Sequence, residues 1–469
     1  MDPGAPGLRL TVRDAYALAF GMFLGLALLK FGNPVILNGI VLPPRSLTEA
    51  WSDPWPPIWA VWLLLPFAAL GAWITIAQRL RWSMSRWLWV LPLVWLGWQL
   101  ISATATVDRQ LTEVALLQFA GCVAAYFLGI LIIGYEGGMR LMMIGLLGAL
   151  AICLVRAVDQ RLFEFPQERK MLVEGERAGW TNFPPDVLRE MEQEHIIIST
   201  NGMNVANPVI LAKLEKNRAY GTLVYPNALA GAVLLLFPCA LVVAVIGTRR
   251  FRTATRLMTV GLALFLGVGG LFWTGSKSGW LIAVAIGVLW LLRLKWPFRG
   301  KVALIALLAI GSMTVFAVHF RNYFASGATS VEARFDYWRA AAQITREHPV
   351  LGSGPGTFQR PYARLKSPDA EMARLTHNDY IEQFCDSGII GGAAYLAWVG
   401  ILFMALWKRL WRDQDQMKFA LFVGLLGWFA QGLSEFSLYI PALAWTAFAL
   451  AGCLLGQAGN PFDKSQPPR

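Results

Sequence analysis

The chain has 469 residues, of which 56% are apolar, 13% are aromatic and only 15% are charged. This composition excludes an ordinary soluble globular protein, in which about 25% of the residues are charged. The formal net charge of +12 is not accompanied by any base-reading motif, which argues against nucleic acid as a partner. The chain is therefore predicted to be a membrane protein.

Apolar runs of about 20 residues, the length that a helix needs to cross a membrane, recur along nearly the whole chain. They predict an all-α, polytopic membrane helix bundle. The first run lacks a short apolar region followed by a small-residue cleavage site, so it is expected to be a retained helix and not a signal peptide. The twelve predicted spans are 13–31, 57–77, 87–104, 114–134, 139–157, 223–247, 257–274, 278–293, 302–319, 388–407, 418–434 and 438–457.

Basic residues in the short connections predict the orientation, because such loops stay in the cytoplasm. If the chain crosses the membrane twelve times, all the basic connections fall on the same side. This arrangement predicts that both termini are cytoplasmic and that two long polar segments lie on the outer face. The first outer segment is expected to be either a helical lid or a plain solvated loop. The predicted divisions are N-terminal transmembrane helices (1–155), the first outer segment (156–222), central transmembrane helices (223–319), a large outer loop (320–387), and C-terminal transmembrane helices with a tail (388–469).

The stretch THNDYIEQF, which begins at residue 376, predicts the start of a helix. Thr376 is the expected N-cap, and Asp379 is its expected capping-box partner. His377 would then lie in the first turn, where the positive end of the helix disfavours imidazolium and leaves a neutral ring that can accept a proton. His377 is therefore a candidate general base, supported by Asn378 and Asp379. The alternative is a hydrogen-bonded anchor at the membrane interface.

Basic residues on the same side of the membrane are candidate anion contacts. The segment RAYGTLVYPNALAG, residues 218–231, brings Arg218 and Asn227 to the start of the sixth span. TGSKSG, residues 274–279, places Lys277 between two spans, where a cation is costly unless it faces the bundle interior or a counter-ion. The alternative for Lys277 is a side chain that extends to the interface.

A further arginine lies in VEARFDYWRAAAQITREHPV, a predicted helix in the second outer loop with Phe335, Trp338, Ala342 and Ile344 on its apolar face. Its Arg334 either contacts an anion or is solvated on an amphipathic helix at the membrane surface.

The segment GSGPGTF, residues 352–358, follows this helix. It predicts a tight backbone bend, and such a turn can also bring main-chain N–H groups close to phosphate. It is neither a Walker loop nor a dinucleotide fingerprint. Together these residues supply several cations, one neutral base and no obvious carboxylate cluster for a metal. That combination predicts a diphosphate substrate and no cofactor.

These segments resemble the O-antigen ligase and polymerase superfamily of bacterial inner-membrane glycosyltransferases. RAYGTLVYPNALAG is similar to the family's arginine-containing segment and TGSKSGWL to its short outward turn. HPVLGSGPGTF followed by THNDYIEQFCDSGIIGG is similar to its large loop and closing helix. The resemblance extends over most of the chain from the sixth span onwards. It implies a GT-C-like fold with a helical periplasmic loop domain, in the bacterial inner membrane, with an active site on the periplasmic face.

The resemblance also implies the partners: a glycan donor on undecaprenyl diphosphate, reached from the membrane lipid, and an acceptor hydroxyl on a glycan or lipid. Arg218 and Lys277 would hold the diphosphate, Arg334 would add a contact, and His377 would act as the base in a metal-independent, inverting displacement. The family usually has arginine where this chain has Lys277. Lysine is a point charge without the bidentate fork of arginine.

Within this chemistry the acceptor distinguishes three activities: lipid A–core sugar for a ligase, a second lipid-linked repeat for a polymerase, and a protein hydroxyl for a protein O-glycosyltransferase. The ligase is preferred because the outer segments are moderate in size and the closing helix carries the strongest resemblance. A lipid or polysaccharide transporter is the alternative from a different class. It predicts charged or broken helices at mid-membrane, whereas polar residues such as Gln431 and Glu435 gather here near the outer side.

Overall fold

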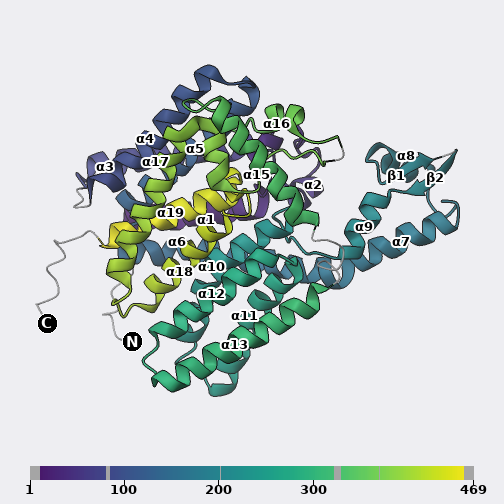
Figure 1. The fold of residues 1–469 in the computed structure, drawn as a ribbon. Helices are drawn as coiled ribbons and strands as arrows, with labels where there is room; N and C mark the ends of the chain where they lie inside the picture. The colour runs from purple at the N-terminus through teal and green to yellow at the C-terminus, as the bar shows by residue number, and fades with distance from the viewer. Residues whose placement is uncertain (1–10, 81–84, 201, 322–328, 369, 459–469) are drawn as a thin grey trace, which may run out of the picture.

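A bundle of long apolar helices makes up most of this computed structural model, which describes residues 11–80, 85–200, 202–321, 329–368 and 370–458 (Figure 1). Shorter elements lie at one end of the bundle and to one side. The long helices are α1 (Val12–Lys30), α3 (Pro57–Ala77), α4 (Arg86–Ser102), α5 (Arg109–Leu128), α6 (Glu136–Asp159), α10 (Pro226–Gly247), α11 (Thr253–Thr274), α12 (Lys277–Arg293), α13 (Phe298–His319), α17 (Asp379–Leu410), α18 (Gln416–Gln431) and α19 (Pro441–Ala458). The other helices and strands are α2 (Leu47–Ser52), α7 (Phe165–Arg177), α8 (Pro185–Gln193), β1 (Ile197–Thr200), β2 (Met203–Ala206), α9 (Pro208–Lys216), α15 (Thr329–Glu347) and α16 (Gln359–Leu365).

Each of the twelve predicted spans overlaps one of the long helices. Within the described ranges, nine helices are long and apolar enough to cross a membrane. The helices α12, α18 and α19 have 17, 16 and 18 residues and fall outside that group. The chain is therefore a multi-pass membrane protein, and the count of twelve spans stays a prediction.

Small residues allow the membrane helices to approach each other closely. A Cβ on Gly21 of α1 would lie 2.4 Å from the carbonyl oxygen of Met142 on α6, and a Cβ on Gly145 would lie 2.3 Å from the Gly21 carbonyl oxygen. In lipid, helix association depends on such packing because burying apolar surface gives little driving force there. By contrast, no residue of α13 is buried, as expected for a helix that faces lipid.

Successive long helices alternate in direction, so the bundle has two opposite ends. We call the end that holds the starts of α10, α12, α17 and α19 the site end. The end of α1 also lies there, because the N–H of Ala442 donates to the carbonyl oxygen of Phe31 at 3.3 Å. The opposite end, the basic end, holds the predicted cytoplasmic connections. There the guanidinium of Arg293 lies 4.0 Å from the ring centroid of Phe419, which joins two of these connections.

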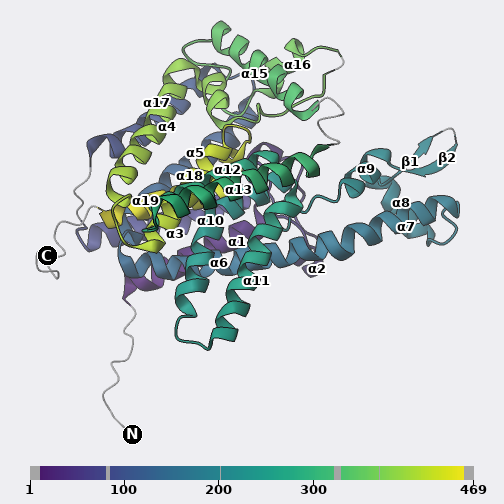
Figure 2. The same ribbon diagram turned by 60° about the horizontal axis from the view of Figure 1, so that its bottom comes forward.

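The first outer segment forms a lobe that projects from the bundle in both views (Figures 1 and 2). A π-helical turn at Gln160–Glu164 continues α6 into α7, which gives an unbroken helix of 41 residues, Gly137–Arg177. We call α7, α8, β1, β2 and α9 the α7–α9 lobe. Its own core consists of Phe165, Leu172, Trp180, Met191, Ile197, Ala206 and Leu214.

The α7–α9 lobe departs from the all-α prediction, because β1 and β2 form an antiparallel hairpin in which Ile197 lies opposite Ala206. The apolar run before residue 201, followed by the dipeptide NG, is a sequence signal for a two-residue hairpin turn. The hairpin is too short to change the fold class, which is that of a helical membrane protein.

The second outer segment packs onto the start of α17 (Figure 2). We call α15, α16 and the chain up to residue 378 the loop lobe. The predicted helix is confirmed as α15, but its apolar face differs: Phe335 is 56% exposed, whereas Tyr337 and Ala341 are buried. The core of the lobe reaches into α17, because it contains Cys385 together with Tyr337, Ala340, Ala341, Ile344, Phe358, Tyr362 and Ala373.

Candidate active site

His377 lies immediately before α17 in a left-handed backbone conformation, with φ of 54°. Residues other than glycine rarely adopt this conformation, so neighbouring contacts must hold it. Asn378 is the N-cap of α17: its Oδ1 accepts hydrogen bonds from the N–H groups of Tyr380 and Ile381, each at 3.0 Å. Its Nδ2 donates to the carbonyl oxygen of Leu433 at 2.9 Å. Asn378 therefore fixes the chain directly after His377.

The prediction that Thr376 caps this helix with Asp379 as its partner is wrong. The N–H of Thr376 donates to Glu382 Oε2 at 2.5 Å. The buried carboxylate of Asp379 accepts from the N–H of Leu438, at 3.1 and 3.2 Å to its two oxygens. These tertiary partners replace the local capping box, so His377 precedes the N-cap and does not lie in the first turn.

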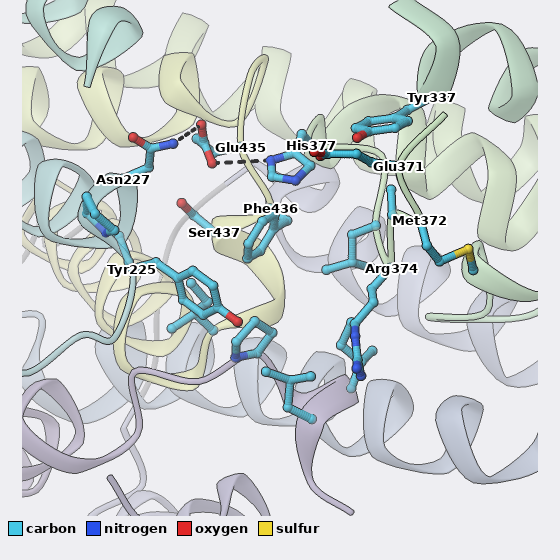
Figure 3. Close-up of a pocket in the computed structure, with 18 of the residues that line it drawn as sticks. Tyr225, Asn227, Tyr337, Glu371, Met372, Arg374, His377, Glu435, Phe436 and Ser437 are labelled. Atoms are coloured by element: carbon cyan, nitrogen blue, oxygen red, sulfur yellow. Dashed lines mark hydrogen bonds and ion pairs between the residues drawn. The ribbon is translucent and has the colours of Figure 1, made fainter. Parts of the chain in front are cut away.

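A buried carboxylate, Glu435, lies at the centre of the site and is 4% exposed. Its Oε1 accepts from Asn227 Nδ2 and from the Arg334 guanidinium, both at 2.6 Å. Its Oε2 lies 3.6 Å from His377 Nδ1 (Figure 3). Asn227 Oδ1 in turn accepts from the Arg218 guanidinium at 2.8 Å. The structure thus brings four of the predicted site residues together around one carboxylate.

Arg218 lies in the chain that leads into α10, and its guanidinium is held by hydrogen bonds. Besides its contact with Asn227, its Nε donates at 2.6 Å to the carbonyl oxygen of Thr274, the last residue of α11. Burial lowers the pKa of the Arg218 guanidinium, and the nearby Glu435 carboxylate opposes this effect. The cation is therefore oriented before any substrate binds.

Lys277 is the first residue of α12 and lies next to this cluster and not within it. Its Nζ lies 4.9 Å from the ring centroid of Phe320. It lines a cavity of about 330 Å³ together with Arg161, Lys216 and Arg218. Crowded like charges repel one another, so a cavity with this lining favours an anion.

Three cavities adjoin at the site end and share residues. The first, of about 390 Å³, is lined by Arg218, His377 and Glu435 (Figure 3). The second is the Lys277 cavity, which also contains Arg218. The third, of about 510 Å³, is lined by Lys216, Arg334 and His377. We call the three together the cationic cleft.

The glycine-rich turn at residues 352–358 docks the loop lobe onto α17. The N–H of Gly356 donates to Asp386 Oδ2 at 2.9 Å, that of Gly354 to the Asp386 carbonyl oxygen at 2.9 Å, and that of Ser353 to the Cys385 carbonyl oxygen at 3.0 Å. Gly354 and Gly356 have φ of 103° and 71°, which favour glycine. The predicted tight bend is therefore present. The N–H groups of Ser353, Gly354 and Gly356 donate to α17, so they are not directed at a phosphate.

Several charged residues that line the cleft were not predicted as site residues, among them Glu435, Lys216 and Arg374. For Glu435 a signal existed, because an acid beside an apolar span is a functional candidate by default. Lys216 lies in the charged run KLEKNR, where nothing in the sequence separates it from its solvated neighbours.

The fold and the cleft define a polytopic helical membrane protein with a histidine and several cations at one end of its bundle. Residues 262–396 match the family model described as O-Antigen ligase. That stretch is thus a domain of the O-antigen ligase family, which comprises glycosyltransferase-type enzymes of lipopolysaccharide biosynthesis, as the resemblance predicted. The match includes Lys277, Arg334 and His377, whereas Arg218 and Glu435 lie outside it.

The chain is also similar to a curated protein of Haemophilus influenzae (strain Rd) described as "Uncharacterized protein". The two are 26% identical over 149 residues, which cover 26% of this chain and 37% of that relative. The matched part thus spans little more than a third of the relative's length.

Proposed function

We propose that this protein transfers a glycan from an undecaprenyl-diphosphate donor to an acceptor hydroxyl, as an O-antigen ligase with lipid A–core as acceptor. The observation that carries the proposal is the convergence of Arg218, Arg334 and His377 around Glu435, beside Lys277. Fixed cations of this kind stabilise the negative charge that develops on a departing diphosphate.

An apolar cavity next to the cationic cleft supports a lipid-linked donor. It has a volume of about 330 Å³ and lies between α10, α11, α12 and α13, with Phe237, Leu271 and Trp280 in its lining. The ring of Trp280 lies 5.7 Å from that of Phe272, which lines the Lys277 cavity. A polar diphosphate at Lys277 would thus have an apolar surface directly beside it for the first part of its lipid chain.

The position of His377 suits a general base. Its Nδ1 is buried and faces Glu435, which leaves Nε2 for the acceptor hydroxyl. In the proposed step the acceptor oxygen forms a bond to the anomeric carbon while the bond from that carbon to the phosphate oxygen breaks. The hydroxyl proton moves to Nε2, and the diphosphate leaves with the bonding electron pair. Glu435, 3.6 Å from Nδ1, would stabilise the resulting imidazolium.

The proposed location is the bacterial inner membrane, with both termini in the cytoplasm and the cleft on the periplasmic face. The alternating helix directions support this topology, because they place the basic connections opposite the cleft. Loops rich in lysine and arginine stay in the cytoplasm.

The test is glycan transfer in cells that lack their own copy of the protein, with His377→Ala compared with wild type. We expect transfer to fall by about 10²–10⁴-fold, the usual contribution of a positioned base. His348→Ala is the matched control, since His348 is exposed and is not part of the cleft lining. Unchanged transfer by a membrane-inserted His377→Ala protein would refute the proposal.

The acceptor needs a separate measurement. In a deletion strain a ligase leaves full-length polymer that is not attached to lipid A–core, whereas loss of a polymerase leaves only single repeats. We expect unattached full-length polymer, and single repeats would assign the protein to the polymerase activity instead.

A further inference from the structure

Two buried carboxylates, Glu382 and Asp386, lie one turn apart on α17, close after His377. They are 1% and 0% exposed. Residues four apart lie on the same face of a helix, with Cβ atoms about 5–6 Å apart. Within the described part of the chain neither carboxylate forms an ion pair with lysine, arginine or histidine. One oxygen of each, Glu382 Oε1 and Asp386 Oδ1, is buried and has no hydrogen-bond partner.

Ionising both of two adjacent buried carboxylates without a nearby cation costs much free energy, because the two charges repel each other and neither is solvated by water. A single proton held by the pair would remove one of the two charges, and Glu382 Oε1 and Asp386 Oδ1 are the two oxygens without another partner. We propose that Glu382 and Asp386 form a carboxylic acid–carboxylate pair that positions His377. The second half of this inference rests on the proposed function.

The other oxygens of the pair hold two turns of the loop lobe. Glu382 Oε2 accepts the N–H of Thr376, the residue before His377, at 2.5 Å. Asp386 Oδ2 accepts the N–H of Gly356 in the glycine-rich turn at 2.9 Å. One stretch of α17 thereby fixes both turns, and the left-handed conformation of His377 depends on the first of them.

Within the described part of the chain, three other titratable groups interact with the pair. They are Asp379 and Cys385 on α17 itself and Tyr439 on the short 3₁₀ helix Ser437–Tyr439, whose hydroxyl donates to Asp386 Oδ2. Asp379 already accepts the N–H of Leu438. Among these groups none supplies a positive charge, so a proton is what remains to neutralise the pair.

The proton itself is tested by infrared spectroscopy on the purified full-length protein. We expect the difference spectrum between wild type and Glu382→Gln to show the loss of one protonated carboxyl C=O band. Glu347→Gln is the matched control, because Glu347 is exposed and should show no such loss. A difference spectrum for Glu382→Gln without that band would overturn the pair. This readout does not depend on glycan transfer, so it separates a failure of the pair from a failure of the proposed function.

The positioning role is tested by comparing Glu382→Gln with Glu382→Ala. In the glutamine variant Oε1 can accept from Thr376 and the amide can donate to Asp386, so we expect transfer close to wild type. Glu382→Ala frees the Thr376 turn, and we expect kcat to fall by about 10²-fold with the donor KM unchanged, since the cations are untouched. Equal loss in both variants, or full transfer by Glu382→Ala, would overturn the role. If the alanine variant does not fold, the glutamine result and the infrared band still decide.

Discussion

The two lobes outside the bundle are both long, polar and largely helical, yet they are built differently. The buried core of the α7–α9 lobe consists of residues of that lobe, with Tyr220 of the following segment packed against it, and the lobe projects from the bundle (Figure 1). The core of the loop lobe includes Cys385 of α17, and its turns donate hydrogen bonds to Asp386 and Glu382 of the same helix. Because the loop lobe is bonded to the bundle, it can hold His377 in a fixed position. The α7–α9 lobe has a separate core, so we expect it to contribute to the cleft only through residues where it joins the bundle, such as Lys216.

Besides His377→Ala, the loop lobe offers a second variant with a large expected loss of transfer, Arg334→Ala. It removes a cation from the cleft and leaves the buried Glu435 without its ion pair. Transfer should fall by about 10²–10³-fold, as for loss of one oxyanion-hole donor. The control is Arg339→Ala on the same helix, because the side chain of Arg339 is 79% exposed and forms an ion pair with Asp336 on that helix. Equal effects of the two variants in a membrane transfer assay would contradict a site contact by Arg334.

A smaller effect is expected at the base of the α7–α9 lobe, in the variant Lys216→Ala. Lys216 lines two of the three cavities of the cleft, including the one with Lys277. Because it is exposed, screening limits its effect, and we expect the donor KM to rise about two- to fivefold with kcat retained. Lys213→Ala, one turn earlier on α9, should leave the KM unchanged. A KM that is the same for both variants would show that the base of this lobe takes no part in donor binding.

The smallest effect on transfer is expected from the core of the α7–α9 lobe. Trp180→Ala removes a buried ring and should destabilise that lobe by about 3–5 kcal/mol. Limited proteolysis should then cleave the lobe more readily while transfer stays near wild type, because its core does not contact the cleft. A loss of transfer as large as that of Arg334→Ala would show that the whole lobe, and not only its base, shapes the site.

Local pattern was sufficient for much of the fold. Every predicted span overlaps a helix because an apolar run in lipid must satisfy its backbone groups internally. The helix α15 was also predicted, although its exposed Phe335 was assigned to the apolar face. Hydropathy measures the length of an apolar run, so it did not predict the pairing of β1 with β2. It also predicted spans at α12, α18 and α19, although these helices of 16–18 residues fall outside the group that is long and apolar enough to cross a membrane.

The sequence by itself determined a helical membrane protein with two long polar segments. It also supplied five candidate site residues, namely Arg218, Asn227, Lys277, Arg334 and His377. Only the tertiary structure decided how they relate, because their partners are remote in the chain. Glu435 lies 208 residues from Asn227 and 101 from Arg334, yet accepts a hydrogen bond from each. For the same reason Glu382, and not Asp379, binds the Thr376 turn. A buried polar group takes whichever partner the fold brings within reach, since leaving it unpaired costs more than any local preference provides.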